Sequence, residues 1–247
     1  AAFDVFPGAP AVTDGATIAF KGNYTVGVVA KTGVYYRDLE DQDITDPDGE
    51  PLGPAGGSNP VVLIANNTHT LIPGTNPPVV FGSTAPPSAA NREAVFAGFD
   101  NEDNPTSGGI YLAPLVPYPL AQQPKLKTLV SIGSNVPGEA NAQFNRLGEG
   151  VAFDGRLVAF WGAWGAETTT LRLYCPNEGN QARIAYCKSA ASGSTFDPDV
   201  DNWYQERQVP DNQGIFVHDT KSGQTTRVAR TGGDFADFVY WNFSGRA

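Results

Sequence analysis

The apolar residues of this chain fall in short runs separated by turn residues, and no stretch carries a convincing helical period of apolar positions. The runs recur in one order, three times, at a spacing of roughly 75 residues. Each copy has a small-residue turn, an apolar strand, a variable loop, a Gly-apolar-aromatic strand, another apolar strand and a Pro-Gly or Gly-Gly turn. Such self-similarity predicts a repeated β-meander.

The matching segments can be read directly from the sequence. The first apolar strand contains residues 18–20, 95–98 and 157–160 in the three copies. The Gly-apolar-aromatic strand contains residues 33–35, 109–111 and 214–216. The following strand contains residues 61–65, 126–130 and 226–229. The three copies span about 3–79, 80–143 and 144–234, and residues 235–247 resemble the opening of a further copy.

These strands predict an all-β fold, a β-propeller of four-stranded antiparallel blades in a single domain. A propeller ring normally needs four or more blades, so three copies leave the ring incomplete. Either the chain is truncated or processed, or self-association or a further chain completes the ring. Alternatively, the long insertion at 177–211 hides a degenerate blade that has extra strands at 171–175 and 183–187.

The pattern G-x-V-A-F, then G-I-Y/F, then V-A-x-x-G resembles the tandem repeats of exported, cell-surface-anchored bacterial β-propeller proteins. The resemblance covers nearly the whole chain. It implies a propeller fold and an extracellular location. That family supplies no settled activity and no catalytic motif to transfer.

Charge and composition narrow the classes of function. The formal net charge is −10, and the 16 Lys and Arg residues are scattered, which argues against nucleic-acid binding. No apolar stretch is long enough for a membrane span. The chain has no Met and no basic-then-apolar leader, which favours a mature exported protein, although a trimmed chain has the same appearance.

Cysteines and sequons also favour secretion. Cys175 and Cys187 are the only cysteines, and their spacing suits one local disulfide better than a zinc or redox site. Asn23, Asn66 and Asn242 begin N-x-Ser/Thr sequons, which are compatible with glycosylation but also arise by chance.

The densest group of carboxylates lies in residues 38–50 and includes Asp43, Asp46 and Asp48. Because Ca²⁺ binds six to eight oxygens, an Asp-rich loop with turn residues is a candidate calcium site. A solvated acidic turn is the alternative. Similar groups recur at Asp100, Glu102 and Asp103 and at Asp197, Asp199 and Asp201.

The chain has two histidines, His69 and His218, and each lies near a strand end beside a variable loop. A histidine there is a candidate general base, with Arg207 or a tyrosine to complete the site. Polysaccharide lyases built on propellers use such groupings, which is an analogy of fold. Structural, exposed histidines are the alternative.

Aromatic residues supply the candidate ligand surface. Trp203 and Tyr204, together with Trp161 and Trp164, offer flat faces on which a sugar ring can stack. Packing between blades is the alternative for Trp164, and the neighbouring Phe160 fits the core position taken by Phe20 and Phe96.

The predicted function is a secreted, carbohydrate-active propeller that binds or cleaves a polysaccharide, by a lyase reaction if it is catalytic. The alternative is a non-catalytic extracellular interaction or matrix scaffold. The expected partner is a glycan, with Ca²⁺ as a candidate cofactor.

Overall fold

The computed structural model describes residues 2–39, 59–117 and 120–232. The calcium candidates Asp43, Asp46 and Asp48 and the sequon residue Asn242 lie outside these ranges. The chain divides into two compact units, one formed by Ala1–Trp164 with Gln213–Ala247 and the other by Gly165–Asn212. The structure is mostly β, and its sheets are antiparallel, as the sequence predicts.

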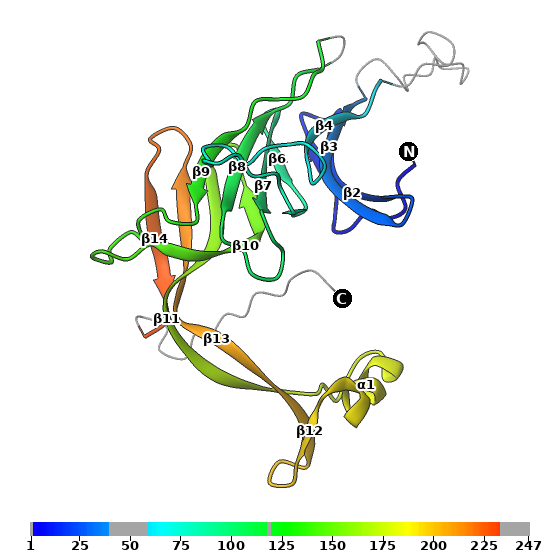
Figure 1. Cartoon of the computed structure of the whole chain (residues 1–247), viewed down its shortest axis with the longest axis vertical. Coiled ribbons are helices and arrows are strands. Elements are labelled where there is room, and N and C mark those ends of the chain that lie inside the picture. Colours follow the sequence, from blue (N-terminus) through cyan, green and yellow to red (C-terminus); the bar gives the residue numbers. More distant parts are fainter. Residues whose placement is uncertain (1, 40–58, 118–119, 233–247) are drawn as a thin grey trace. The chain divides into compact units, whose positions relative to one another are not determined.

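The first sheet of the larger unit has strands in the order β1-β2-β3-β4 (Figure 1). The strands are β1 (Ala11–Thr13), β2 (Thr17–Val26), β3 (Val29–Asp38) and β4 (Val62–Asn66). A β-bulge between β3 and β4 leaves Ile64 as the extra residue, because Val34 pairs with Ala65 and Tyr35 with Leu63.

The second sheet repeats this arrangement. Its strands are β5 (Ser83–Thr84), β6 (Ser88–Ala90), β7 (Glu93–Phe99), β8 (Gly108–Pro114) and β9 (Lys127–Ser131). β5 and β6 both pair with β7, so together they take the place that β1 has in the first sheet. The bulge recurs between β8 and β9.

The third sheet contains β10 (Phe144–Phe153), β11 (Leu157–Tyr174), β13 (Asn202–Asp219) and β14 (Thr225–Arg230). The bulge recurs a third time, between β13 and β14. The described residues therefore contain one sheet for each sequence repeat, with strands in the predicted order.

The insertion of the third repeat does not form the degenerate blade that was one reading of the sequence. β11 and β13 continue into the smaller unit, where β12 (Thr195–Asp197) pairs with β13. Residues 183–187 belong to the helix α1 (Gln181–Cys187) and not to a strand, and a 3₁₀ turn follows at Ala190–Ser192. Asn180 caps this helix by accepting a hydrogen bond from the Arg183 backbone N–H. The predicted disulfide is confirmed, since Cys187 at the end of α1 is bonded to Cys175.

Each sheet carries three aromatic rings on one face, which we call its front face; the opposite face is its back face. One ring precedes the sheet's long hairpin, and the other two lie on the paired strands of that hairpin. These aromatic triads are Phe3, Phe20 and Tyr35; Phe81, Phe96 and Tyr111; and Phe144, Phe160 and Phe216.

The triads share one geometry. The first ring meets the third edge-on, with centroids 4.9 Å apart in Phe3–Tyr35, 5.3 Å in Phe81–Tyr111 and 4.9 Å in Phe144–Phe216. The two hairpin rings lie 5.6 to 5.9 Å apart with small interplanar angles. Aromatic rings prefer edge-on and offset arrangements of this kind.

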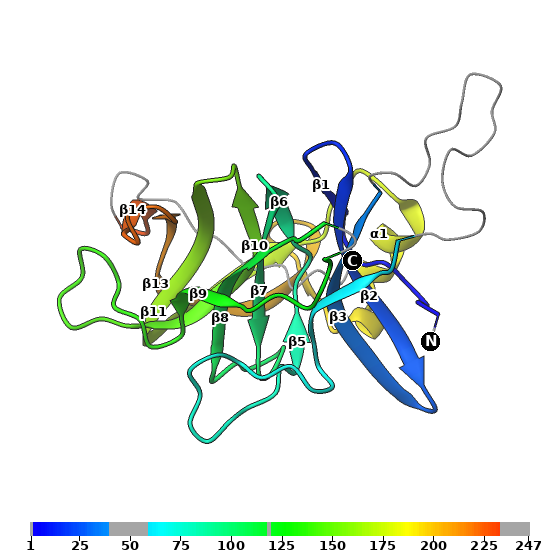
Figure 2. The ribbon, with the colours of Figure 1, turned by 90° about the horizontal axis from the view of Figure 1, so that it is seen from above.

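The triads of the second and third sheets are buried against the sheet before them. Figure 2 shows the ribbons of the three sheets of the larger unit from above. In one core cluster, the front face of the second sheet packs against Ala19, Val34 and Tyr36 on the back face of the first. In the other, the front face of the third sheet packs against Val95, Ile110 and Leu112 on the back face of the second. All six rings are no more than 2% exposed. The sheets of the larger unit therefore stack face to face.

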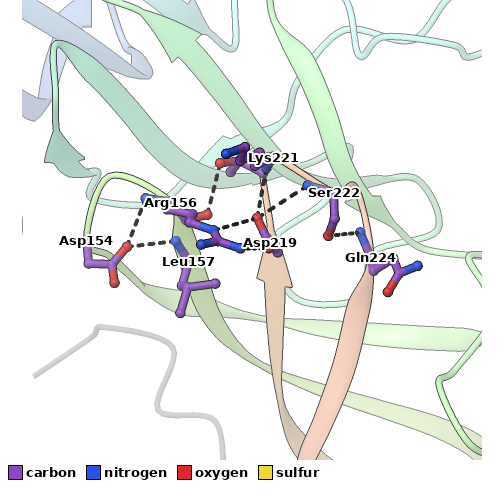
Figure 3. A network of polar contacts seen from close by, with 8 residues as sticks. Asp154, Arg156, Leu157, Asp219, Lys221, Ser222 and Gln224 are labelled. Atoms are coloured by element: carbon purple, nitrogen blue, oxygen red, sulfur yellow. Dashed lines mark hydrogen bonds and ion pairs between the residues drawn. The ribbon is translucent and has the colours of Figure 1, made fainter.

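Polar contacts tie together two turns of the third sheet (Figure 3). Arg156, in the β10–β11 turn, donates two hydrogen bonds to the Asp219 carboxylate, at 3.1 and 2.6 Å. Asp219 also accepts from the backbone N–H groups of Lys221 and Ser222, and Asp154 accepts from those of Arg156 and Leu157. The Arg156 guanidinium holds the pKa of Asp219 well below its usual range.

No helix among the described residues is long and apolar enough to span a membrane.

A glycine permits the close approach of each triad. A Cβ on Gly98 would lie 2.7 Å from the ring of Phe81, which is packed between two sheets. We expect Gly98→Ala to lower the free energy of unfolding by about 1–3 kcal/mol through overpacking, measured by urea denaturation. Gly22→Ala should cost less, because Phe3 is less buried. Gly150→Ala is the control, since its Cβ meets nothing within 4 Å; equal losses for Gly98 and Gly150 would contradict this packing.

The Asp219 contacts predict a dependence of stability on pH. Because folding lowers the pKa of Asp219, its contribution is complete above the unfolded-state pKa of about 3.9 and is lost as pH falls toward the folded-state value. Asp219→Asn should therefore be less stable than the wild type at pH 7, and the gap should narrow as pH falls below about 4. Urea denaturation across this range measures it, and a gap that does not change with pH would refute the assignment.

Candidate functional site

A cleft of about 560 Å³ with polar and charged side chains in its lining lies in the larger unit, and we call it the sheet-edge cleft. It is lined by the N-terminal segment, the β2–β3 hairpin and the start of the second sheet, together with one residue of β10. The lining side chains that concern its chemistry are Lys21, Asn23, Tyr24, Lys31, Thr32, Asn67, Ser83, Glu102 and Glu149.

The cleft arises where the back face of the first sheet changes from apolar to polar. Side chains alternate between the two faces of a strand, so Lys21 and Asn23 continue the face of β2 that buries Ala19 in the core. On β3, Thr32 likewise continues the face that buries Val34. The interface between the first two sheets therefore has an apolar core at one end. At the other end lies the cleft, with its polar and charged side chains.

Hydrogen bonds hold the wall of the cleft. The Thr32 N–H donates to Asn67 Oδ1 at 3.1 Å. The Thr32 hydroxyl lies 3.5 Å from that of Thr84, next to Ser83 on the second sheet. On the opposite face of β2, Tyr24 hydrogen-bonds to Tyr35, and burial is the main reason that the pKa of Tyr35 is raised. These contacts fix the side chains before any ligand binds.

Two buried oxygens of the cleft have no hydrogen-bond partner among the residues that the structure describes. One is Asn23 Oδ1, and the other is Oγ of Ser83, a residue only 5% exposed. Leaving such a group unsatisfied costs about 1–3 kcal/mol, so buried polar groups are nearly always paired. A ligand that presents hydroxyl groups can donate to Asn23 and either donate to or accept from Ser83.

The cleft also brings charges of both signs to its lining. Lys21 and Lys31 come from β2 and β3, whereas Glu102 and Glu149 come from the second and third sheets. Ammonium and carboxylate groups together can bond hydroxyl groups as donors and acceptors. The arrangement suits a neutral or weakly charged polar ligand better than a polyanion.

The smaller unit displays the predicted aromatic residues Trp203 and Tyr204 on opposite faces of β13. Neighbouring residues of a strand point to opposite faces, and the two pair with different residues of β12, Phe196 and Thr195. Trp203 meets the Phe196 ring edge-on at 5.8 Å, and the Tyr204 ring lies 5.7 Å from that of Tyr174. They do not form one continuous stacking surface.

The face of β13 that carries Tyr204 is rich in charge. The Arg172 guanidinium lies 4.6 Å from the Tyr204 ring centroid and 3.5 Å from Asp197 Oδ2. The Tyr174 hydroxyl donates to Asp197 at 2.7 Å, which is the main reason that the pKa of Asp197 is lowered. This half-exposed group has both flat rings and hydrogen-bonding groups, as a sugar-binding surface requires.

Trp161 and Trp164 are each 4% exposed. Trp164 belongs to the core between the second and third sheets, and the Trp161 indole donates to the buried Gln213. Both rings are therefore buried, and Trp164 packs between two sheets, which was the alternative to ligand contact for this residue.

The candidate catalytic residues are spread over the chain. His69 is exposed in the turn after β4, and its backbone N–H donates to Asn66 Oδ1. His218 is buried with Nδ1 2.9 Å from the Thr225 hydroxyl, and burial lowers its pKa so that the ring is neutral near pH 7. Arg207 lies in the smaller unit, where it donates to Gln205. In the part of the chain described, no hydrogen bond joins the two histidines.

Of the candidate metal and glycan sites, the acidic groups at Asp100 and Asp197 and the sequon residues Asn23 and Asn66 lie among the described residues. Among the described residues, no group of three His, Cys, Asp or Glu side chains is arranged to hold a metal ion. Asp100 uses its carboxylate on Thr106 and Ser107. The Asn66 side chain is buried and organises its turn, so a glycan there would require the turn to open. Asn23 lines the sheet-edge cleft, a role that its sequon did not indicate.

No family model matches this chain, and no curated protein matches its sequence. Function is therefore inferred from geometry alone.

Because Trp203 and Tyr204 point in opposite directions, their alanine variants should differ in ligand affinity. If a sugar stacks on one face, only Trp203→Ala or only Tyr204→Ala will weaken binding, by about fivefold for a contact of about 1 kcal/mol. Calorimetry with a bound oligosaccharide measures both. Equal weakening by the two substitutions would place both rings on one ligand surface and contradict the assignment.

Proposed function

We propose that the three sheets are blades of a β-propeller and that the protein is extracellular. The repeated strand order, bulge and aromatic triad support the blade reading, because each sheet is the same unit packed on its neighbour. The disulfide between Cys175 and Cys187 supports an oxidising compartment.

We propose further that this protein binds a glycan in the sheet-edge cleft. The observation that carries the proposal is the pair of buried oxygens, Asn23 Oδ1 and Ser83 Oγ, that have no hydrogen-bond partner among the described residues. A sugar presents several hydroxyl groups, which can donate to Asn23 and donate to or accept from Ser83. The Tyr204 face of the smaller unit is a separate candidate surface for sugar stacking.

Charge favours a neutral or weakly acidic glycan. The net charge of −10 repels polyanions at long range, whereas Lys21 and Lys31 supply a local positive charge within the cleft. Binding is proposed over cleavage because His218 is buried, with Nδ1 2.9 Å from the Thr225 hydroxyl, and its ring is therefore poorly accessible to a substrate.

Ser83→Ala tests the proposal directly. Removing an unsatisfied hydroxyl should leave the unliganded protein as stable as the wild type or slightly more stable. The same change should weaken glycan binding by about fivefold to tenfold, for the loss of about 1–1.4 kcal/mol. A panel of neutral and acidic oligosaccharides identifies the ligand, and calorimetry gives the affinity.

Ser134→Ala is the matched control, since that hydroxyl bonds to Ser131 away from the cleft. Its glycan affinity should equal that of the wild type. A glycan whose affinity does not respond to Ser83→Ala would rule out the cleft as its site. If the panel contains no ligand, the non-catalytic interaction scaffold becomes the better description. New reducing ends or unsaturated uronates would instead reveal cleavage.

A further inference from the structure

The first sheet has an aromatic triad that no other sheet of the described structure covers. Phe81, Phe96 and Tyr111 and their counterparts in the third sheet are buried, whereas Phe3 and Phe20 are partly exposed. Phe6 packs on both of these rings, at 5.3 and 5.6 Å, and is 57% exposed. The front face of the first sheet is thus built like the two buried front faces but remains open.

This open face is hollowed. An apolar groove of about 460 Å³ follows it, and the side chains that line the groove include Phe3, Phe6, Ile18, Phe20, Leu39 and Val61. Apolar surface gathered in a groove usually marks an interaction site in a protein.

The two buried interfaces show what fits such a face. In both, the triad packs against the back face of the preceding sheet, which is formed by another copy of the repeat. That back face presents small and aliphatic side chains to the triad. The residue at the β-bulge belongs to this surface: Ile64 of the first sheet is fully buried, and Leu129 of the second packs against the core.

The third sheet carries the matching surface, and part of it is open. Val228 is its bulge residue, because Phe216 pairs with Arg227 and Ile215 with Ala229. Unlike Ile64 and Leu129, Val228 is 59% exposed, and Leu157 at the start of β11 is also exposed. Both halves of the interface therefore occur on one chain, an open front face on the first sheet and exposed apolar residues, Leu157 and Val228, on the back face of the third.

We propose that the open front face of the first sheet binds the back face of the third sheet in a second copy of this chain. The contact is heterologous, so it must close into a ring or continue as a filament. Two copies contribute six sheets, within the range of four to eight blades of closed propellers. Closure by two equal contacts leaves no front face open. The inference rests on the sheet packing and not on glycan binding.

The association is tested by sedimentation of the chain over a concentration series. We expect a species of twice the chain mass. Phe6→Glu on the front face and Val228→Glu on the back face should each weaken association at least tenfold, because each places a charge in an apolar contact. Val61→Glu provides a second front-face variant if Phe6→Glu does not fold. Val28→Glu is the control, since Val28 is 98% exposed at the hairpin tip and outside both faces.

Mixing the variants distinguishes this contact from a symmetric one. Phe6→Glu and Val228→Glu chains retain one intact contact between them, so the mixture should form a mixed pair although each variant alone is monomeric. A front-to-front dimer would be unaffected by Val228→Glu, which would overturn the proposal. A wild-type chain that stays monomeric up to about 100 µM, where even weak specific contacts form, would overturn it as well.

Discussion

The structure of the larger unit depends on one recurrent contact, an aromatic triad buried against the aliphatic back face of the preceding sheet. A single four-stranded sheet cannot bury both of its faces, and face-to-face stacking gives each sheet a core without one large central core. Two features of the backbone permit the contact. The glycine two residues after Phe20, Phe96 or Phe160 admits the edge-on ring, and the bulge displaces an aliphatic residue toward the next sheet.

The same interface explains where a ligand can bind. Every second residue of β2 and β3 faces the second sheet. These residues are apolar at one end of the contact between the first two sheets and polar at the other end. Among the described residues, the polar end does not pair all its groups, since Asn23 Oδ1 and Ser83 Oγ are left without hydrogen-bond partners. Because both residues line the cleft, a ligand that enters it can supply the missing hydrogen bonds.

The sequence predicts the recurring parts of this fold and the disulfide. It does not predict other features that occur only once. The order of strands, the core positions of Phe96 and Phe160 and the pairing of Cys175 with Cys187 follow from the repeat and from spacing. Helix α1 was missed because it spans only seven residues and buries only Ile184, too few positions for a period to show. The cleft could not be predicted, since Asn23, Ser83 and Glu149 come from three repeats. Whether an oxygen lacks a hydrogen-bond partner depends on which atoms the folded chain brings near it, and the sequence does not show this.

The most direct test of the central claim is a crystal structure of the chain with a bound oligosaccharide. We predict sugar density in the sheet-edge cleft, with hydroxyl groups within hydrogen-bonding distance of Asn23 Oδ1 and Ser83 Oγ, and with the triads of the second and third sheets buried as described. An oligosaccharide bound elsewhere, with both oxygens paired to protein groups, would contradict the claim that the polar end of the sheet interface is the site.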